Sequence, residues 1–293
     1  MIIVDSHVHI LPQQRLDGLS IWLGKVFEEH PLAGNKFTPN ALISELRSKC
    51  DYVFNLVYPM RAYETESLNL FNYNLANDFE HVIPFGSLHV DNDDKPGIVE
   101  RCVKEYGFRG FKLHPYVQRF SPDDERLFPA YQIMEDSGCV INIHTGFDTA
   151  YPKKEKAITL SMMEALIKRF SSLTFILPHM FYPELDDALY LLETYENVFI
   201  DTTNIFSAIL QDEVMGIDRD KQRETLSVTL NRWSKRAVFG TDHPAGMSDL
   251  DTIYSDFLSF DMKKHIREDL QYNTAYSILT KCGFCDHCRE GES

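Results

Sequence analysis

The sequence contains no long apolar run, and its basic residues are outnumbered by acidic ones. No stretch approaches the roughly 20 apolar residues that a membrane-spanning helix needs. The N-terminus has no basic segment, signal-length apolar run or small-residue cleavage site, so we expect a soluble cytoplasmic protein. With 44 acidic against 29 basic residues, a formal net charge of −15 argues against nucleic-acid or anionic-membrane partners.

Markers of a second domain and of a disulfide framework are also missing. The chain has no Gly/Ser-rich linker, composition shift or low-complexity segment. Six cysteines do not make a disulfide framework in a 293-residue chain without a secretion signal. We therefore predict one domain over residues 1–281, followed by a cysteine-rich tail over residues 282–293.

What the sequence does contain is a regular alternation of short strand-like runs and longer segments with helical spacing. Strands that alternate with helices favour a parallel sheet, and eight such units match an α/β fold of the (β/α)₈ (TIM) barrel type. A doubly wound open sheet is the alternative. The long connection from Leu11 to Phe37 is a candidate lid. The eight runs, rich in β-branched and aromatic residues, are 2–9, 52–57, 82–88, 110–114, 140–144, 173–179, 198–203 and 237–242.

Start and stop signals predict where several helices lie. Thr38-Pro39 supplies a capping side chain and a proline at the first helical position. Ser121-Pro122 repeats this arrangement before a helix expected over 123–137, which Gly138 would end. Further helices are predicted over 183–195 and 268–281.

The ends of the predicted strands carry histidine and aspartate. The first run ends in His7-Val8-His9, and residues two apart on a strand point to the same face, so both imidazoles can reach one ion. The pair alone is a weak signal, because 11 histidines produce such a spacing easily by chance.

The other strand ends strengthen the prediction of a metal site at His7 and His9. Runs four, five, six and eight end in KLHP, IHTG, PH and TDHP, which contain His114, His144, His179 and Asp242. In a barrel these ends meet on one face, where barrel active sites lie. A buried imidazole or carboxylate there costs free energy unless it is paired or metal-bound.

At this point the chain resembles the amidohydrolase superfamily, and within it the small amidohydrolase-related branch, of the aminocarboxymuconate-semialdehyde decarboxylase and pyrone-dicarboxylate lactonase types. The resemblance rests on VDSHVHI, GFKLHP, INIHTG, LPHM and FGTDHP, which occur in family order between residue 2 and about residue 245. It implies the same barrel fold and a divalent metal.

The resemblance also implies a role for each strand-end residue. His7, His9 and His144 match metal ligands, and Asp242 matches a ligand that also shuttles a proton. His179 matches a histidine that orients the reacting water in single-metal members and binds metal in two-metal members. Lys112 matches a lysine that is carboxylated and bridges two metals in some members; the alternative is that Lys112 pairs with a carboxylate such as Asp5 or Asp201.

These donors suit Zn²⁺, with Mn²⁺ or Fe²⁺ as alternatives, and the site would hold one or two ions. We expect a metal-dependent hydrolase that acts on an amide, ester or lactone of a small, carboxylated substrate through a metal-activated water. Asp242 and His179 are the expected catalytic residues. The alternatives are a metal-dependent decarboxylase of a small aromatic or muconate-like acid and a non-catalytic metal-binding protein. Barrels of this kind are often dimers, so a homodimer is also an expectation.

Two further groups of residues are candidates for binding. The loops that follow the strands offer substrate contacts, since a basic group there would favour a carboxylate or phosphate. The tail offers a Cys₃His zinc or redox site, although its spacing is tight and the other interpretation is a reduced tail outside the chemistry. The loop candidates are Arg61, Tyr116, Arg119 and Phe147, with Tyr58, Asp148 and Asn204 beside them; the tail candidates are Cys282, Cys285, His287 and Cys288.

Overall fold

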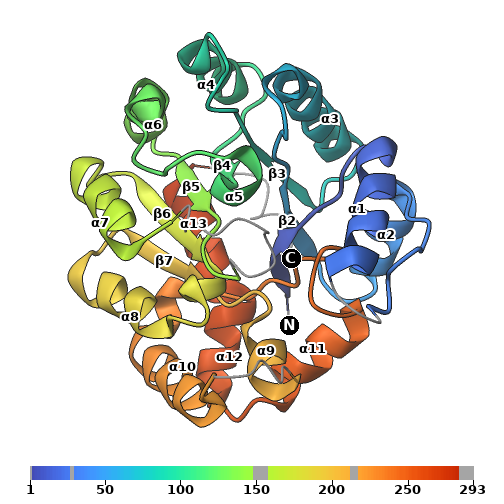
Figure 1. Ribbon diagram of the computed structural model, residues 1–293, viewed down its shortest axis with the longest axis vertical. Helices are drawn as coiled ribbons and strands as arrows, with labels where there is room; N and C mark the ends of the chain where they lie inside the picture. The colour runs from blue at the N-terminus through green and yellow to red at the C-terminus, as the bar shows by residue number, and fades with distance from the viewer. Residues whose placement is uncertain (1, 27–29, 148–157, 212–216, 284–293) are drawn as a thin grey trace, which may run out of the picture.

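Eight parallel strands form one sheet in chain order in the computed structural model, which describes residues 2–26, 30–147, 158–211 and 217–283 (Figure 1). The strands are shorter than the sequence patterns predict, and most of the polar residues at the ends of these patterns follow the strands. They are β1 (Val4–Val8), β2 (Tyr52–Leu56), β3 (Val82–Gly86), β4 (Gly110–Leu113), β5 (Val140–Ile143), β6 (Thr174–Pro178), β7 (Val198–Asp201) and β8 (Ala237–Val238).

Backbone hydrogen bonds join the last strand to the first. The amide of Asp242 donates to the carbonyl of His7 over 2.7 Å, and the amide of His9 donates to the carbonyl of His243 over 2.8 Å. Val8 and His243 form an additional parallel bridge. The sheet is therefore a barrel, as the strand–helix rhythm predicts, and the doubly wound alternative is wrong.

Most of the helices surround the ring of strands, whereas α13 packs against the cluster inside it (Figure 1). None of those in the described segments is both long and apolar enough to cross a membrane. They are α1 (Gln13–Val26), α2 (Pro39–Arg47), α3 (Thr65–Asp78), α4 (Lys95–Lys104), α5 (Pro115–Gln118), α6 (Phe128–Asp136), α7 (Leu160–Arg169), α8 (Leu185–Thr194), α9 (Ile205–Gln211), α10 (Arg219–Trp233), α11 (Leu250–Ser259), α12 (Lys264–Glu268) and α13 (Thr274–Lys281).

The sequence signals predict the start of α2 correctly but not that of α6. Thr38 caps α2 through its side chain, as predicted, by accepting from the amide of Ala41. Helix α6 begins at Phe128, later than Ser121-Pro122 predicts, because Asp124 caps a separate 3₁₀ turn first. Much of the connection between Leu11 and Phe37 is helix α1 rather than an irregular lid.

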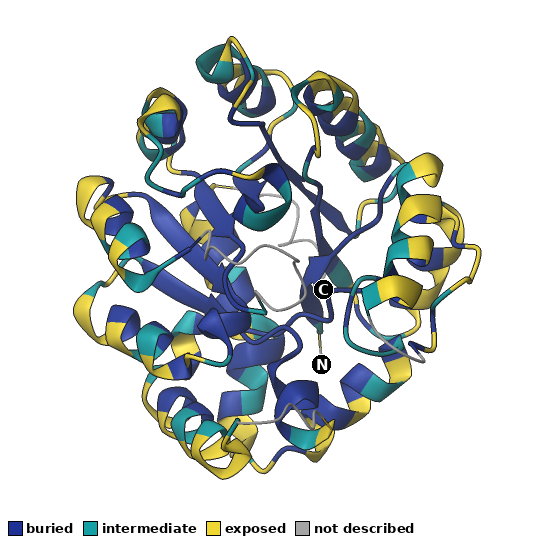
Figure 2. Cartoon of the chain, viewed as in Figure 1, coloured by how far each residue is buried: buried dark blue, intermediate teal, exposed yellow. Residues whose placement is uncertain are grey.

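The core has two layers. Apolar side chains between the strands and the outer helices form the larger one. A smaller cluster includes Phe54, Phe85 and Phe199 and packs against Ile278 of α13. Figure 2 shows the strands almost entirely buried, while the helices expose only their outward faces. Polar side chains at the carboxyl ends of the strands are thus held on a rigid, dry scaffold.

Candidate metal centre

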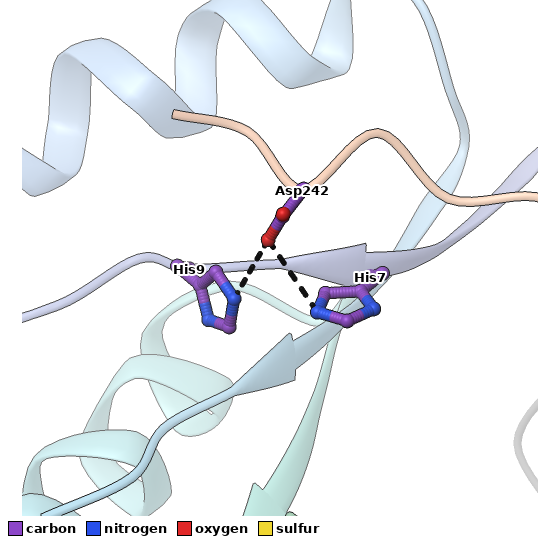
Figure 3. Close-up of side chains that lie close together, drawn as sticks. All are labelled: His7, His9 and Asp242. Atoms are coloured by element: carbon purple, nitrogen blue, oxygen red, sulfur yellow. Dashed lines mark ion pairs between the residues drawn. The ribbon is translucent and has the colours of Figure 1, made fainter. Parts of the chain in front are cut away.

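Two imidazoles and one carboxylate converge where β1 and β8 end. Asp242 Oδ1 lies 2.9 Å from His9 Nε2 and 3.5 Å from His7 Nε2 (Figure 3). One potential ligand atom from each of the three buried residues lies within 4.8 Å of the others. The structure therefore brings together three of the residues that the strand ends single out. We call them the His7–His9–Asp242 group.

Hydrogen bonds on the far side of each ring determine which nitrogen faces this group. The carbonyl of Leu56 lies 2.6 Å from His9 Nδ1 and can only accept, so Nδ1 carries a hydrogen and Nε2 is the nitrogen that a metal could bind. Nε2 of His7 is also buried and makes no hydrogen bond with a described residue. The Nε2 atoms of both rings therefore face a carboxylate oxygen, an arrangement that a bound cation would stabilise. The donor set thus fits a divalent metal.

Asp201, at the end of β7, holds the other nitrogen of His7. Its Oδ2 lies 2.6 Å from His7 Nδ1, and its Oδ1 accepts from the amide of Thr203 over 2.9 Å. Both side chains are fully buried. A carboxylate in this place fixes the tautomer and the orientation of a metal-ligating histidine. Sequence reasoning considered Asp201 only as a partner of Lys112 and missed this contact, although Asp201 ends a strand as the other site residues do.

His144 and His179 border the group. The ring centroids of His179 and His7 are 5.4 Å apart, and those of His144 and His179 are 4.5 Å apart. His179 Nδ1 faces the carbonyl of Thr203 at 3.0 Å, so its Nε2, which is buried without a hydrogen bond, also presents a lone pair. The ring of His144 stacks on that of His114 at 3.8 Å. The strand-end histidines and Asp242 thus lie in one cluster.

Burial keeps several of these imidazoles neutral. It lowers the pKa of His7 and of His144 well below the usual histidine value, and the neighbouring Lys112 and imidazoles add to the effect. Burial also lowers the pKa of His179 to about 4, although the charge of Asp242 opposes it. Neutral imidazole is the form that binds a metal, so these side chains need not lose a proton at neutral pH.

Lys112 lies fully buried next to the ligands, but its partner is not the one expected. Its Nζ donates to Oδ1 of Asn142, its register partner on β5, over 2.8 Å. Asp5 instead accepts from the amide and hydroxyl of Thr241, and Asp201 faces His7. The predicted ion pair of Lys112 with Asp5 or Asp201 is wrong within the described residues. Burial lowers the pKa of Lys112, which favours a neutral amine.

Asp242 is oriented by a residue that we expected to contact substrate. Asn204 Nδ2 donates to Asp242 Oδ2 over 3.0 Å, while Asn204 Oδ1 accepts from the amide of Met247. The amide of Asn204 therefore positions the carboxylate. Burial opposes ionisation of Asp242, but the basic side chains beside it, His9, His179 and Lys112, hold its pKa below the usual value.

The backbone around the site is strained. In the described part of the chain, seven non-glycine residues have positive φ, and all of them follow one of strands β4 to β8. Three are consecutive, His179, Met180 and Phe181, and form a left-handed turn after β6. Such conformations cost free energy and persist only where surrounding contacts enforce them.

Residues after β5 enforce this turn. Thr145 Oγ1 donates to the carbonyl of Pro178 over 2.5 Å and accepts from the amide of Phe181. A Cβ on Gly146 would lie 2.6 Å from the backbone nitrogen of Tyr182, so only glycine fits against the turn. The segment after β5 thus holds the turn that carries His179.

The predicted substrate contacts divide into two groups. Aromatic side chains lie against the imidazoles: Tyr116 is edge-on to His144 at 5.7 Å, and Phe147 is edge-on to His179 at 5.3 Å. Arg61 and Arg119 are exposed, and the structure does not bring them into contact with the imidazoles. Among the predicted substrate contacts, the aromatic side chains rather than the arginines therefore border the described part of the centre.

The tail candidates are only partly described. Cys282 is buried in the apolar cluster under α13, and burial raises its pKa to about 11. Cys285, His287 and Cys288 lie outside the described residues, as does Asp148. A metal or redox role for the tail stays a prediction.

A comparison with models of known protein families finds one that matches this chain. A family model described as amidohydrolase matches residues 82–279, which is more than half of the chain. The match begins at β3 and includes the strand ends that carry His144, His179 and Asp242.

Solved structures resemble the whole barrel. An uncharacterised TIM-barrel protein from Bordetella bronchiseptica superposes with a TM-score of 0.74 at 18% identity, covering 97% of this chain and 100% of the other. A 5-carboxyvanillate decarboxylase from Sphingomonas paucimobilis gives 0.67 at 12% identity, covering 96% and 99%. A protein from Pseudomonas putida described as a 2-pyrone-4,6-dicarboxylic acid hydrolase gives 0.64 at 13%, covering 96% and 98%. At these identities the likeness shows the fold alone.

Proposed function

The chain belongs to the amidohydrolase family, and on that premise we propose that it is a metal-dependent hydrolase of a small, carboxylated amide, ester or lactone. The observation that carries the proposal is the convergence of two imidazole nitrogens and one carboxylate oxygen in the buried His7–His9–Asp242 group. The group lies at the carboxyl ends of the strands, where barrel active sites occur.

The proposed ligands are His7, His9 and Asp242, with His144 and His179 available beside them. Imidazole and carboxylate donors favour Zn²⁺, and Mn²⁺ or Fe²⁺ also suit them. A divalent ion held there supplies a water of lowered pKa and polarises the scissile carbonyl. In a two-metal site Lys112 would be carboxylated and bridge the ions, and its lowered pKa supports the neutral amine that carboxylation needs.

In this proposal Asp242 transfers the proton and His179 orients the attacking water. Asn204 holds one oxygen of Asp242, so the carboxylate has a defined direction in which to accept a proton from the attacking water and return it to the leaving group. His179 presents an unprotonated Nε2, which can accept a hydrogen bond from that water and orient it.

Decarboxylation of a small aromatic acid is the second candidate. The rings of Tyr58, Tyr116 and Phe147 lie against the imidazoles and suit a flat, conjugated substrate. The similarity to a 5-carboxyvanillate decarboxylase is in line with this reaction. The same centre could orient the carboxylate that leaves as CO₂.

The test combines metal analysis with product analysis. Protein purified without chelator should contain at least about one equivalent of a transition metal, and activity should disappear on chelation and return with the metal. The panel should contain a lactone dicarboxylate, simple amides and esters, and an ortho-hydroxybenzoic acid. Ring opening or hydrolysis supports the first candidate, whereas CO₂ release alone supports the second. Less than half an equivalent of metal, together with no turnover, would reject both.

A further inference from the structure

Tyr58 lies beside His9 and is held by contacts on three sides. Its ring is edge-on to His9 with centroids 5.3 Å apart and lies 4.9 Å from His114. The guanidinium of Arg15 lies 5.7 Å from the ring centroid, and Arg15 Nη2 donates to the carbonyl of Tyr58 over 3.3 Å. Arg15 is itself held by Glu64 at 3.1 Å. The phenol ring therefore has a defined place.

The hydroxyl of this tyrosine has no hydrogen-bond partner among the described residues. Tyr58 is only partly buried, and its hydroxyl is not among the fully enclosed polar atoms, so it is open to a bound ligand. Burial and the charge of Asp242 raise the pKa of Tyr58 to about 12, against the opposing effect of Arg15. The group is thus a phenol at neutral pH and can donate its hydrogen.

We infer that Tyr58 is a substrate-binding residue whose hydroxyl donates a hydrogen bond to an oxygen of the ligand held at the His7–His9–Asp242 group. Fixed donors of this kind stabilise the negative charge that develops on a reacting oxygen, because they need no reorganisation during the reaction. The inference rests on the proposed function, since it needs a metal centre that binds an oxygen-bearing substrate.

The alternative is that Tyr58 only packs against His9 and keeps this ligand in place. Tyr58→Phe separates the two roles, because it keeps the ring contacts with His9, His114 and Arg15 and removes the hydroxyl alone. A packing role predicts no change on this substitution. A hydrogen bond to the ligand predicts weaker binding with unchanged metal content.

The experiment measures binding of acetohydroxamate to the metal-loaded protein by calorimetry. This probe offers two oxygens to a metal regardless of the natural substrate. Tyr58→Phe should weaken its binding by about fivefold, the loss expected for one neutral hydrogen bond, with metal content and thermal midpoint unchanged. With a substrate from the panel, Tyr58→Phe should lower kcat about 10- to 100-fold. KM should change by less than about threefold.

Tyr63→Phe is the matched control. Tyr63 lies in the same β2–α3 connection but is 83% exposed. The substitution Tyr63→Phe should therefore leave the binding of the probe unchanged. Equal affinity of wild type and Tyr58→Phe, loss of metal in Tyr58→Phe, or failure of metal-loaded wild type to bind the probe would each overturn the inference. Metal-loaded protein that binds the probe but turns over no substrate would refute the proposed function alone, and the binding data would still decide the role of Tyr58.

Discussion

Asp201 Oδ2 lies 2.6 Å from Nδ1 of His7, and both side chains are completely buried, although 194 residues separate them in the chain. Burial raises the pKa of Asp201, and the two donors of Thr203 oppose that rise. Asp201 thus contacts Nδ1 of His7, while Nε2 of the same ring faces Asp242.

Replacing Asp201 should weaken metal binding without removing a ligand. Asp201→Asn should lower the affinity for Zn²⁺ by about 10- to 100-fold, because His7 loses the acceptor that fixes its tautomer. A chelator competition titration measures this. Asp269→Asn is the control, since Asp269 is also buried but binds Ser234 away from the centre; an equal loss of affinity there would point to general destabilisation instead.

His179 should separate the one-metal and two-metal interpretations. If it orients the attacking water, His179→Asn should keep about one equivalent of metal and lower kcat by about 100- to 10,000-fold. Metal content and steady-state rates on the same preparation test this. A fall in metal content parallel to the fall in activity would show that His179 is a ligand, and the exposed His265→Asn should change neither quantity.

Gly146 should tolerate no side chain. In Gly146→Ala the new Cβ would lie 2.6 Å from the nitrogen of Tyr182 at a φ of +72°, so the turn that carries His179 must shift. We expect a loss of about 2–4 kcal/mol of unfolding free energy, measured in denaturant, together with reduced activity. Gly138→Ala has a similar φ of +64° but open space at its Cβ, so it should cost only about 1–2 kcal/mol and leave activity intact. Equal costs would show that the contact with the turn is unimportant.

Glu164 should make stability depend on acid pH. Hydrogen bonds from Tyr190 and Tyr195, together with Lys168, lower its pKa from 4.5 to about 2. A carboxylate with a depressed pKa in the folded state stabilises that state above its unfolded pKa, and the contribution disappears as the pH falls through the folded value. The thermal midpoint of wild type should therefore exceed that of Glu164→Gln above about pH 5, and the difference should shrink below about pH 4.

Glu100→Gln is the comparison for this effect. Glu100 binds Lys104 at the same i,i+4 spacing, but among the described residues no tyrosine donates to it. Glu100→Gln should therefore lower the thermal midpoint at neutral pH by less than Glu164→Gln does. A pH-independent difference between wild type and Glu164→Gln would contradict the assignment.

The positions of the site residues could be predicted from the sequence, but their partners could not. The period of two along each strand places His7 and His9 on one face, and the barrel brings His144, His179 and Asp242 to the same end. Hydrogen bonds between strands follow a different rule, because they depend on register and twist around the closed ring. Lys112 therefore binds Asn142, its register partner, rather than a carboxylate, which no spacing along the chain reveals.

The same limit applies to local structure. The cap of α2 could be predicted because Thr38 and Pro39 act on their immediate neighbours. The left-handed turn at 179–181 could not, because contacts with Thr145 and Gly146 enforce it from another strand. Asn204 likewise looks like a loop residue in the sequence. In the structure its side-chain amide donates to Asp242 and accepts from the backbone of Met247.

The packing of α13 beneath the strands has a consequence for catalysis. Phe54, Phe85 and Phe199 fill the interior, and Ile278 and Cys282 close its lower end. A small molecule therefore has no passage through the barrel, and reactant and product must use the same opening. Product that has not yet departed blocks the next arrival, so inhibition by product should be competitive with substrate.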